Sequence, residues 1–266
     1  MFDSFNRRIH YLRVSVTDRC NLRCQYCMPA EGIQLLRHED ILSFDEIRDV
    51  VNAAVELGVD KVRLTGGEPL VRKGIAELVR MLAAIPGIRD LSMTSNGIFL
   101  ADYARELKNA GLMRVNISLD TTDTEEYREI TRGGDISRVY EGIRAAREAG
   151  LEPVKLNCVV QHSSSEENAL LVRAFAAQVG LQARYIKEMD LASGQWSVVE
   201  GGDGGHCAIC NRLRLTANGY VKPCLFNTLG YSVREHGPRQ ALLMALDSKP
   251  KCGTVNDGGN FYEIGG

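Results

Sequence analysis

Three cysteines fall within a run of eight positions near the start of the chain. Cys20, Cys24 and Cys27 occur in the stretch RCNLRCQYCMPA, separated by three and then two residues. A disulfide framework needs an even number of cysteines, and a tetrahedral zinc site needs a fourth ligand, for which His10 or His38 would be the candidate. Three thiolates from one loop can instead hold a cubic iron–sulfur cluster. Such a cluster keeps its fourth iron free of protein ligands, and an open iron can bind and activate a small molecule.

A second group of three cysteines lies towards the carboxyl end. Cys207, Cys210 and Cys224 occur in HCAICNRLRLTANGYVKPCLF, with spacings of two and thirteen residues. This spacing is compatible with a structural zinc site, in which His206 or Cys252 would be the fourth ligand. It is equally compatible with a second three-thiolate cluster. The chain therefore has two candidate metal centres.

Composition restricts the class of protein. The chain has 266 residues, with 32 Lys+Arg against 34 Asp+Glu and a formal net charge of −2, which does not indicate binding to nucleic acid or to a membrane surface. No apolar run approaches the ~18 residues of a membrane-spanning helix, and MFDSFNRRIH lacks the apolar stretch of a signal peptide. We expect a cytoplasmic protein. In a reducing cytosol its eight cysteines are metal ligands or free thiols rather than disulfides.

Strand and helix patterns alternate along the first two thirds of the chain. Runs rich in β-branched residues predict six strands, at 11–18, 61–67, 90–97, 114–120, 153–160 and 183–190. The apolar spacing of helices occurs between them, at 43–58, 71–85, 101–111, 137–150 and 166–180. Connections of this length join parallel strands through helical crossovers. The sequence thus predicts an α/β fold with a partial (β/α)6 barrel that is open along one side.

The pattern changes after residue 190. A glycine-rich, aperiodic stretch at 191–205 precedes the second cysteine group, which reads as a loop or linker. Between Cys210 and Cys224 the sequence predicts a hairpin that turns at Asn218-Gly219. We therefore predict two domains, a barrel over 1–195 and a small C-terminal domain over 196–266.

The two faces of the predicted strands differ in polarity. Side chains alternate along a strand, and one face is apolar, with residues such as Val14, Val62, Leu64, Val115 and Ile117. The opposite face carries four cations, Arg13, Lys61, Arg63 and Lys155. An antiparallel sheet can turn a polar face to water, but parallel sheets are normally covered on both faces. Burying these cations together without an anion is costly. The sequence therefore predicts a basic lumen that holds a negatively charged ligand.

The first cysteine loop and the segment TGGEP (65–69) resemble those of the radical S-adenosylmethionine (SAM) enzymes. The loop follows the first strand, at the end where parallel α/β folds place their active sites. A pair of glycines lets the backbone approach a ligand closely, although a tight turn is the commoner meaning of Gly-Gly. The resemblance implies that Cys20, Cys24 and Cys27 hold a [4Fe–4S] cluster. SAM chelates its open iron, and an electron from the cluster releases a 5′-deoxyadenosyl radical.

The same resemblance assigns the cofactor contacts residue by residue. The positions that match SAM contacts in the family are Tyr26, Gly66, Gly67, Glu68, Thr94, Ser118 and Met189. Most of them lie at or near the ends of predicted strands, where a ligand at that face of the sheet requires them.

Within this superfamily the chain resembles the MoaA family of GTP 3′,8-cyclases, which act in molybdenum cofactor biosynthesis. The matching segments include LRVSVTDRCNLRCQYCMPAEG, VRLTGGEPLVR, MTSNG, RVNISLD and the final IGG, besides the pattern CxxC-NRLRLT-ANG-x5-CLF around the second cysteine group. The resemblance implies that Cys207, Cys210 and Cys224 hold a second [4Fe–4S] cluster, whose open iron takes the guanine. It also implies the reaction of a lyase, which converts GTP to 3′,8-cyclo-7,8-dihydro-GTP after the radical removes the hydrogen from ribose C3′.

Basic residues match those that hold the triphosphate in the family. They are Arg13, Lys61, Arg63, Lys155, Arg184, Arg212 and Arg214, and of these we expect Arg13, Arg212 and Arg214 to act in catalysis as well. The terminal Gly265-Gly266 matches a tail that enters the active site in relatives. The expected partners are the small-molecule substrate and an external electron donor, without nucleic acid or membrane, while monomer and homodimer both stay open.

The chain departs from the family pattern in one place. Only residues 190–206 separate the last predicted barrel strand from the second cysteine group, where the family has several tens of residues more. An alternative is therefore a related radical SAM enzyme with an auxiliary cluster that acts on a peptide or another anionic substrate. A non-enzymatic metal-binding or electron-transfer module would not need the TGGEP segment. Cys158 is expected to be a core residue, and Cys252 has no assigned role.

Overall fold

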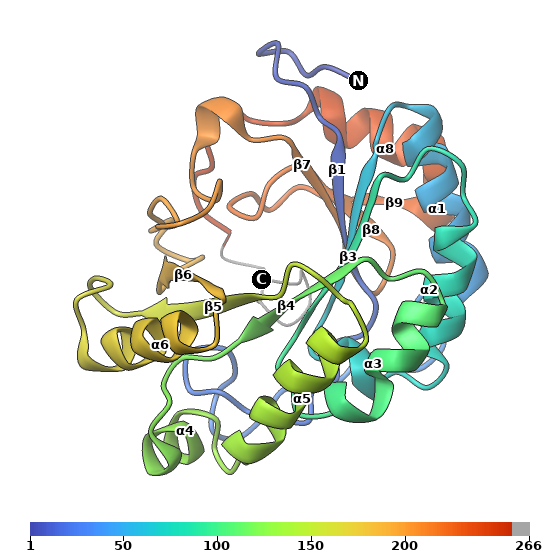
Figure 1. The fold of residues 1–266 in the computed structure, drawn as a ribbon. Coiled ribbons are helices and arrows are strands. Elements are labelled where there is room, and N and C mark those ends of the chain that lie inside the picture. Colours follow the sequence, from blue (N-terminus) through green and yellow to red (C-terminus); the bar gives the residue numbers. More distant parts are fainter. Residues whose placement is uncertain (257–266) are drawn as a thin grey trace.

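A single curved sheet organises the protein in the computed structural model, which describes residues 1–256 (Figure 1). The order of its nine strands is β6-β5-β4-β3-β2-β1-β7-β8-β9, and the sheet is not closed. The strands are β1 (Tyr11–Ser15), β2 (Lys61–Thr65), β3 (Asp90–Ser95), β4 (Arg114–Ser118), β5 (Lys155–Val160), β6 (Gln182–Lys187), β7 (Arg212–Leu215), β8 (Tyr220–Lys222) and β9 (Tyr231–Ser232). Strands β1 to β6 are parallel, and each pairs with the next along the chain. The predicted partial barrel of six parallel strands is confirmed.

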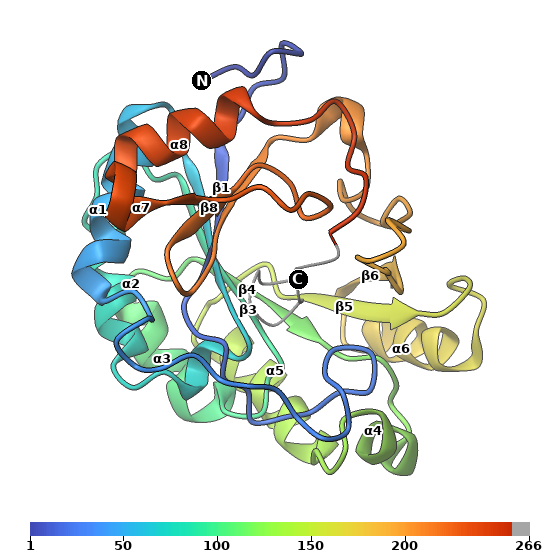
Figure 2. The ribbon, with the colours of Figure 1, turned by 180° about the vertical axis from the view of Figure 1, so that it is seen from behind.

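Helices cover the outer side of the curved sheet and, within residues 1–256, leave its inner side free of helices (Figures 1 and 2). They are α1 (Phe44–Glu56), α2 (Ile75–Ala83), α3 (Leu100–Asn109), α4 (Thr124–Ile130), α5 (Ile136–Glu148), α6 (Glu167–Gln178), α7 (Val233–His236) and α8 (Pro238–Asp247), with short 3-10 helices at η1 (Pro69–Val71) and η2 (Cys207–Ile209). A capping box begins α1: the Ser43 hydroxyl accepts from Glu46 N, and the Glu46 carboxylate accepts from Ser43 N. Helix α4 was not predicted.

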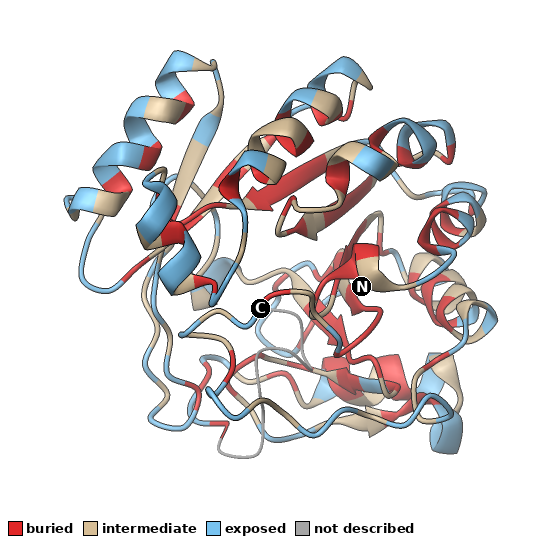
Figure 3. Ribbon diagram, turned by 90° about the horizontal axis from the view of Figure 1, so that it is seen from below, coloured by how far each residue is buried: buried red, intermediate tan, exposed pale blue. Residues whose placement is uncertain are grey.

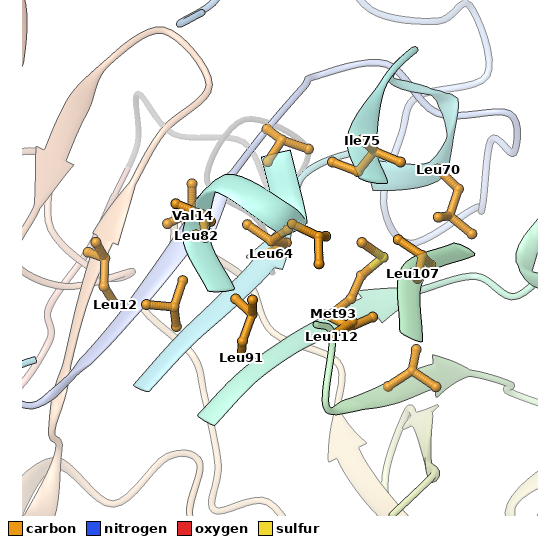
Figure 4. Packing of buried hydrophobic residues seen from close by; sticks show 14 of the residues in the cluster. Leu12, Val14, Leu64, Leu70, Ile75, Leu82, Leu91, Met93, Leu107 and Leu112 are labelled. Atoms are coloured by element: carbon orange, nitrogen blue, oxygen red, sulfur yellow. The ribbon is translucent and has the colours of Figure 1, made fainter. Parts of the chain in front are cut away.

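The core lies between the sheet and these helices. Leu12, Val14 and Leu64 from the strands are fully buried against Leu82 of α2 and neighbouring apolar side chains (Figure 4). Figure 3 shows the same layering, with buried residues along the strands and on the inward sides of the helices. The apolar face predicted from alternation is therefore the face that packs beneath the helices. Among residues 1–256, no helix has the length and apolar character needed to cross a membrane.

The C-terminal segment continues the barrel sheet. Strand β7 lies parallel to β1, with Arg13 paired with Arg63 on one side and with Arg214 on the other. Strands β7 and β8 form the predicted hairpin, with Asn218 and Gly219 in its turn, and β9 extends it. Helix α8 packs against α1. The sequence did not predict the pairing of β7 with β1. The division into two domains at residue 195 stays a prediction, and one sheet contains strands from both sides of it.

Candidate active site

Three cavities adjoin one another on the inner side of the sheet. One, of about 200 Å³, is lined by the first cysteine group, and another, of about 160 Å³, is lined by the second. These two share Thr94, Asn157, Ile186 and Met189 in their walls. A third, of about 350 Å³, is lined by the barrel cations and shares Arg13, Arg63 and Arg212 with the second. The structure thus brings both cysteine groups and the basic lumen to adjoining cavities on one side of the sheet.

The first cysteine loop combines half-buried cysteines with N–H donors to sulfur. Leu22 N donates to Cys20 Sγ at 3.4 Å, and Asn96 Nδ2 lies 3.8 Å from the same sulfur. Burial raises the pKa of Cys20 and of Cys27 to about 11, and burial together with the nearby Asp120 charge raises the pKa of Cys24 to about 12. These thiols keep their protons at neutral pH unless a metal replaces them, which is the chemistry of cluster ligands.

The two glycines of TGGEP pack closely against the backbone that leads into the cysteine loop. A Cβ on Gly66 would lie 2.5 Å from Thr17 O, and one on Gly67 would lie 2.3 Å from Arg19 O. Gly67 N donates to Thr17 O at 2.7 Å, and Glu68 N donates to Arg19 O at 2.8 Å. The sequence argument expected the glycines to admit a ligand. They line the first cavity, but the contact that excludes a side chain is the backbone leading into the cysteine loop.

Glu68 ties this loop to the end of β3. Its buried carboxylate accepts from Leu70 N at 3.0 Å, from Ser95 Oγ at 2.9 Å and from Asn96 N at 2.7 Å. Burial raises the pKa of Glu68 to about 7, although these three donors favour the charged form. Glu68 therefore fixes the wall of the first cavity from which Asn96 reaches Cys20.

Asp120 is a site residue that the sequence argument did not single out. Tyr26 OH donates to its Oδ2 at 2.8 Å and Val159 N donates to its Oδ1 at 2.8 Å, so Asp120 fixes the tyrosine that stands between two cluster cysteines. Burial raises the pKa of Asp120 to about 6. The available signal was strand alternation, because Asn116, Ser118 and Asp120 follow one face of β4 and its extension.

The remaining predicted SAM contacts also lie around the first cavity. Ser118, Thr94 and Met189 line it, together with Tyr26 and the two glycines. Thr94 Oγ1 is buried and has no hydrogen-bond partner within residues 1–256. A buried hydroxyl without a partner is costly, so this atom marks a position where a polar ligand would be stabilised.

The basic lumen exists as the strand pattern predicted. Arg13, Lys61, Arg63, Lys155, Arg184 and Arg212 line the third cavity, while Arg13, Arg63, Arg212 and Arg214 line the second. Burial lowers the pKa of Arg13, and Arg214 and other cations lower it further. Burial followed by the charges of Arg63 and Arg114 likewise lowers the pKa of Arg184. Cations crowded in this way would be stabilised by an anion.

Tyr11 and Asn116 belong to the lumen but were not predicted as site residues. The Tyr11 ring centroid lies 4.9 Å from Lys61 Nζ, and 5.7 Å from the guanidinium carbons of both Arg63 and Arg212. Both amide atoms of Asn116 are buried without a partner among the described residues. Alternation along β1 places Tyr11 on the face of Arg13, and that spacing was the signal for it.

The second cysteine group has cationic surroundings. Lys249 is buried, and its Nζ donates to Arg212 O at 2.8 Å and to Pro223 O at 2.6 Å. Burial opposes ionisation of Cys210, but Lys249 and Arg212 outweigh it and lower the pKa of this thiol. Burial raises the pKa of Cys224 despite Lys249. Positive charge beside these sulfurs suits a centre that carries bound thiolates.

The zinc alternative for the first cysteine group finds no support in the described part of the chain, whereas at the second group Cys252 Sγ lies 2.9 Å from Cys207 Sγ and stays a candidate fourth ligand. Within residues 1–256, no three His, Cys, Asp or Glu side chains lie close enough together to hold one metal ion. His10 is engaged elsewhere, 2.8 Å from Asp60 and 3.1 Å from Asn211. A single tetrahedral ion draws its ligands together, whereas a cubic cluster holds its cysteines at separate corners. Three thiols around one cavity, as in each group here, fit the cluster.

Comparison with known proteins identifies the class. Residues 14–175 match the family model of the radical SAM superfamily. The fold is similar to Streptococcus suis SuiB bound to S-adenosylmethionine, with a TM-score of 0.68 and 15% identity over 91% of this chain and 66% of that one. It is also similar to anSMEcpe with bound AdoMet, with a TM-score of 0.65 and 14% identity over 91% and 81% of the two chains. The chain belongs to the radical SAM superfamily, whose cofactors are a [4Fe–4S] cluster and SAM.

Curated relatives identify the family within this class. The chain is 45% identical to the GTP 3′,8-cyclase of Moorella thermoacetica over 85% of this chain and 84% of that protein. It is 39% identical to the GTP 3′,8-cyclase of Peptoclostridium acidaminophilum over 100% and 98% of the two chains. The chain is therefore a member of the GTP 3′,8-cyclase family. The second alignment spans 319 positions for the 266 residues of this chain, which leaves 53 positions without a residue here.

Proposed function

We propose that the protein is a GTP 3′,8-cyclase of molybdenum cofactor biosynthesis, which converts GTP to 3′,8-cyclo-7,8-dihydro-GTP. Relatives of that name, with identities near 40%, support the proposal. The observation that carries it is the arrangement of the adjoining cavities. The first cysteine group and the proposed SAM contacts line one cavity, and the second cysteine group lines another that shares cations with the basic lumen. A reaction in which a radical derived from SAM removes a hydrogen atom from a nucleoside triphosphate needs both molecules in a single chamber.

Cys20, Cys24 and Cys27 would hold the first [4Fe–4S] cluster, with SAM in the first cavity. When bound, these cofactors supply the 5′-deoxyadenosyl radical that removes the hydrogen from ribose C3′ of GTP. Tyr26, Gly66, Gly67, Glu68, Thr94, Ser118 and Met189 are the proposed SAM contacts. Among them Thr94 offers the buried hydroxyl without a partner, and it also lines the cavity of the second cysteine group. Thr94 and Met189 thus mark the boundary between cofactor and substrate.

Cys207, Cys210 and Cys224 would hold a second [4Fe–4S] cluster that takes the guanine at its open iron. The triphosphate would lie among the lumen cations, where Arg63, Lys155 and Arg184 come from three different strands. Arginine suits phosphate because its planar fork donates in pairs, whereas lysine acts as a point charge. Binding at many points fixes the ribose relative to the radical source, and positioning of this kind supplies much of a rate enhancement.

Arg13, Arg212 and Arg214 are the proposed catalytic cations. All three line the cavity of the second cysteine group, and Arg13 and Arg214 are neighbours across β1 and β7. They would touch the nucleotide near its reacting atoms and stabilise negative charge there. Their strands are paired within one sheet, so the substrate would not have to order them on binding.

The shortened segment before the second cysteine group is compatible with this function. Residues 190–206 form a compact connection between β6 and Cys207, where the family pattern has several tens of residues more. Trp196 packs on Phe226 with ring centroids 4.8 Å apart, in a small apolar cluster with Leu191 and Leu225. The connection therefore packs onto the C-terminal segment and leaves the lumen cations in place. The predicted role of Gly265-Gly266 falls outside the described residues.

The direct test uses GTP deuterated at C3′. Anaerobically reconstituted protein is reduced and incubated with SAM and the labelled GTP, and the 5′-deoxyadenosine is analysed by mass spectrometry. We expect deuterium in 5′-deoxyadenosine and a cyclised nucleotide product. An external one-electron donor such as dithionite replaces the physiological one. Cleavage of SAM without transfer of deuterium would reject GTP as the hydrogen donor and would leave a radical SAM enzyme with another substrate.

A further inference from the structure

A strap of eight residues, 249–256, crosses the second cysteine group. One end is fixed by Lys249, whose buried ammonium donates to the backbone on both sides of the hairpin. The other end is fixed by Thr254 N, which donates to Phe226 O at 2.9 Å, and by Asn256, which bonds to Leu191 O at 2.8 Å and to Leu225 O at 2.9 Å. A segment tied at both ends presents the residues between them at a defined place.

Arg7 holds the first part of this strap, Pro250 and Lys251, against the cysteine group. Its Nη1 donates to Cys207 O at 2.7 Å and to Lys251 O at 2.9 Å, and its Nη2 donates to Pro250 O at 2.7 Å. Its Nε is paired with Asp3 at 2.7 Å, and both side chains are buried. One guanidinium therefore joins the backbone of Cys207 to the residue that precedes Cys252.

The result is a close pair of sulfurs. Cys252 Sγ lies 2.9 Å from Cys207 Sγ, whereas a disulfide bond measures about 2.05 Å. The two thiols therefore need only a small approach to form a bond. Cys207, Cys210 and Cys224 line the cavity, but Cys252 is not among its lining residues and is exposed. Cys252 is therefore accessible from solvent while it contacts Cys207.

We propose that Cys207 and Cys252 form a reversible disulfide in the cluster-free chain, with a low-molecular-weight disulfide as the oxidant. The exposed Cys252 thiolate attacks one sulfur of the oxidant, which forms a mixed disulfide and releases one small thiolate. Cys207 then attacks Cys252 Sγ, which forms the internal bond and releases the second small thiolate. Two protein thiols lose two protons and two electrons, and the small disulfide takes up both as two thiols.

The bond withdraws one ligand from the second cysteine group. Cys210 and Cys224 alone cannot hold a cluster that needs three thiolates. The second cluster is then inserted only after a reductant has opened the bond, while the first cysteine group accepts its cluster in either state. This consequence rests on the proposed second cluster, whereas formation of the disulfide does not.

Peptide mapping tests the bond itself. The full chain, freed of metal, is incubated anaerobically with oxidised glutathione, alkylated and digested with trypsin, which releases Cys207 in 188–212 and Cys252 in 252–266. We expect these two peptides to be joined, with fragment ions that assign the link to Cys207, and to separate on addition of dithiothreitol. Cys252→Ser should abolish the link, and the matched control Cys158→Ala, which removes a buried thiol of β5, should retain it. A link through Cys210, or a lasting glutathione adduct on Cys252, would overturn the proposal.

Iron uptake tests the consequence. Oxidised wild-type protein reconstituted without a thiol reductant should bind about four irons per chain, and Cys252→Ser treated identically should bind about eight. Dithiothreitol should bring the wild type to the level of the variant. Equal uptake by both proteins would refute the control of cluster insertion. The deuterium transfer of fully reduced protein is independent of this result, so the two proposals can fail separately.

Discussion

The two cysteine groups adjoin the same interior, but they differ in the charge that surrounds them. The first has buried carboxyl groups nearby, Glu68 and Asp120, and burial raises the pKa values of its thiols. The second has Lys249, Arg212 and Arg214, and the cations lower the pKa of Cys210 against the effect of burial. A metal must displace protons at the first group and at Cys224, whereas nearby cations favour the thiolate of Cys210.

This difference supports the proposed placement of SAM at the first cysteine group and of GTP at the second. SAM carries a cationic sulfonium, and an acidic, closely hydrogen-bonded wall is compatible with it. GTP is an anion, and the basic wall attracts it. The pairing of β7 with β1 places the second cysteine group beside the lumen cations, so in the proposed complex one surface would hold both the charge and the base of the substrate.

The largest effects are expected from breaking each cysteine group alone. Cys24→Ser should reduce iron from about eight to about four per chain and abolish cleavage of SAM, because the first cluster loses a ligand. Cys210→Ser should lose a similar amount of iron but keep cleavage of SAM, while transfer of deuterium from GTP stops. Both are measured by iron analysis and chromatography of 5′-deoxyadenosine, with Cys158→Ala as the control that changes neither. If Cys210→Ser also abolished cleavage of SAM, the two groups would not have separate roles.

The next largest effect is expected from removing one cation of the basic lumen, Arg63. Arg63→Ala removes a buried cation that donates to Ser92 Oγ and faces the lumen, so kcat/KM for GTP should fall roughly 10- to 100-fold, as for one charge-assisted hydrogen bond. Arg63→Lys should recover part of the loss. Arg144→Ala, which removes an exposed cation on α5, is the matched control and should change nothing. An equal loss in Arg144→Ala would show a general charge effect instead of a binding site.

Site residues could be predicted from the sequence where strand alternation or a short motif determines their position. Alternation along β1, β2 and β5 was sufficient to predict Arg13, Arg63 and Lys155 in one lumen, and adjacent motifs predicted the first cysteine group. The pairing of β7 with β1 was not accessible, because it joins segments about 200 residues apart without a local signal. The position of Cys252 depends on Arg7, from the opposite end of the chain. Gly66 and Gly67 were recognised, but only the structure shows which backbone they approach.

The buried carboxyl group of Asp120 should change how the free energy of unfolding depends on pH. Burial raises the pKa of Asp120 from 3.8 to about 6, so the folded chain binds this proton more tightly than the unfolded chain does. The free energy of unfolding should therefore fall as pH rises from about 4 to about 6 and stay level above that, by an amount on the order of 2–3 kcal/mol. Asp120→Asn, which keeps the size of the side chain, should show a flatter profile in urea unfolding between pH 4 and 7.5. Parallel profiles for the two proteins would mean that Asp120 ionises normally.

The smallest effect is expected at the contact between α1 and the C-terminal segment. Glu46 closes the capping box of α1 and also pairs with Arg234 of α7 at 2.7 Å. These contacts lower the pKa of Glu46 to about 2, with the Arg234 hydrogen bond as the largest favourable cause. Their stabilisation should be present above about pH 4.5 and be lost as pH falls towards 2. At pH 7, Glu46→Gln should cost about 0.5–1 kcal/mol in denaturant unfolding, whereas a loss above ~3 kcal/mol would show that this contact determines the fold.

The central claim is that each cysteine group holds its own iron cluster at one interior. Anomalous diffraction at the iron edge, on crystals of the anaerobically reconstituted protein, tests it most directly. The account predicts two strong iron peaks, one within reach of Cys20, Cys24 and Cys27 and the other within reach of Cys207, Cys210 and Cys224. A single peak, or a zinc signal at either cysteine group, would contradict it.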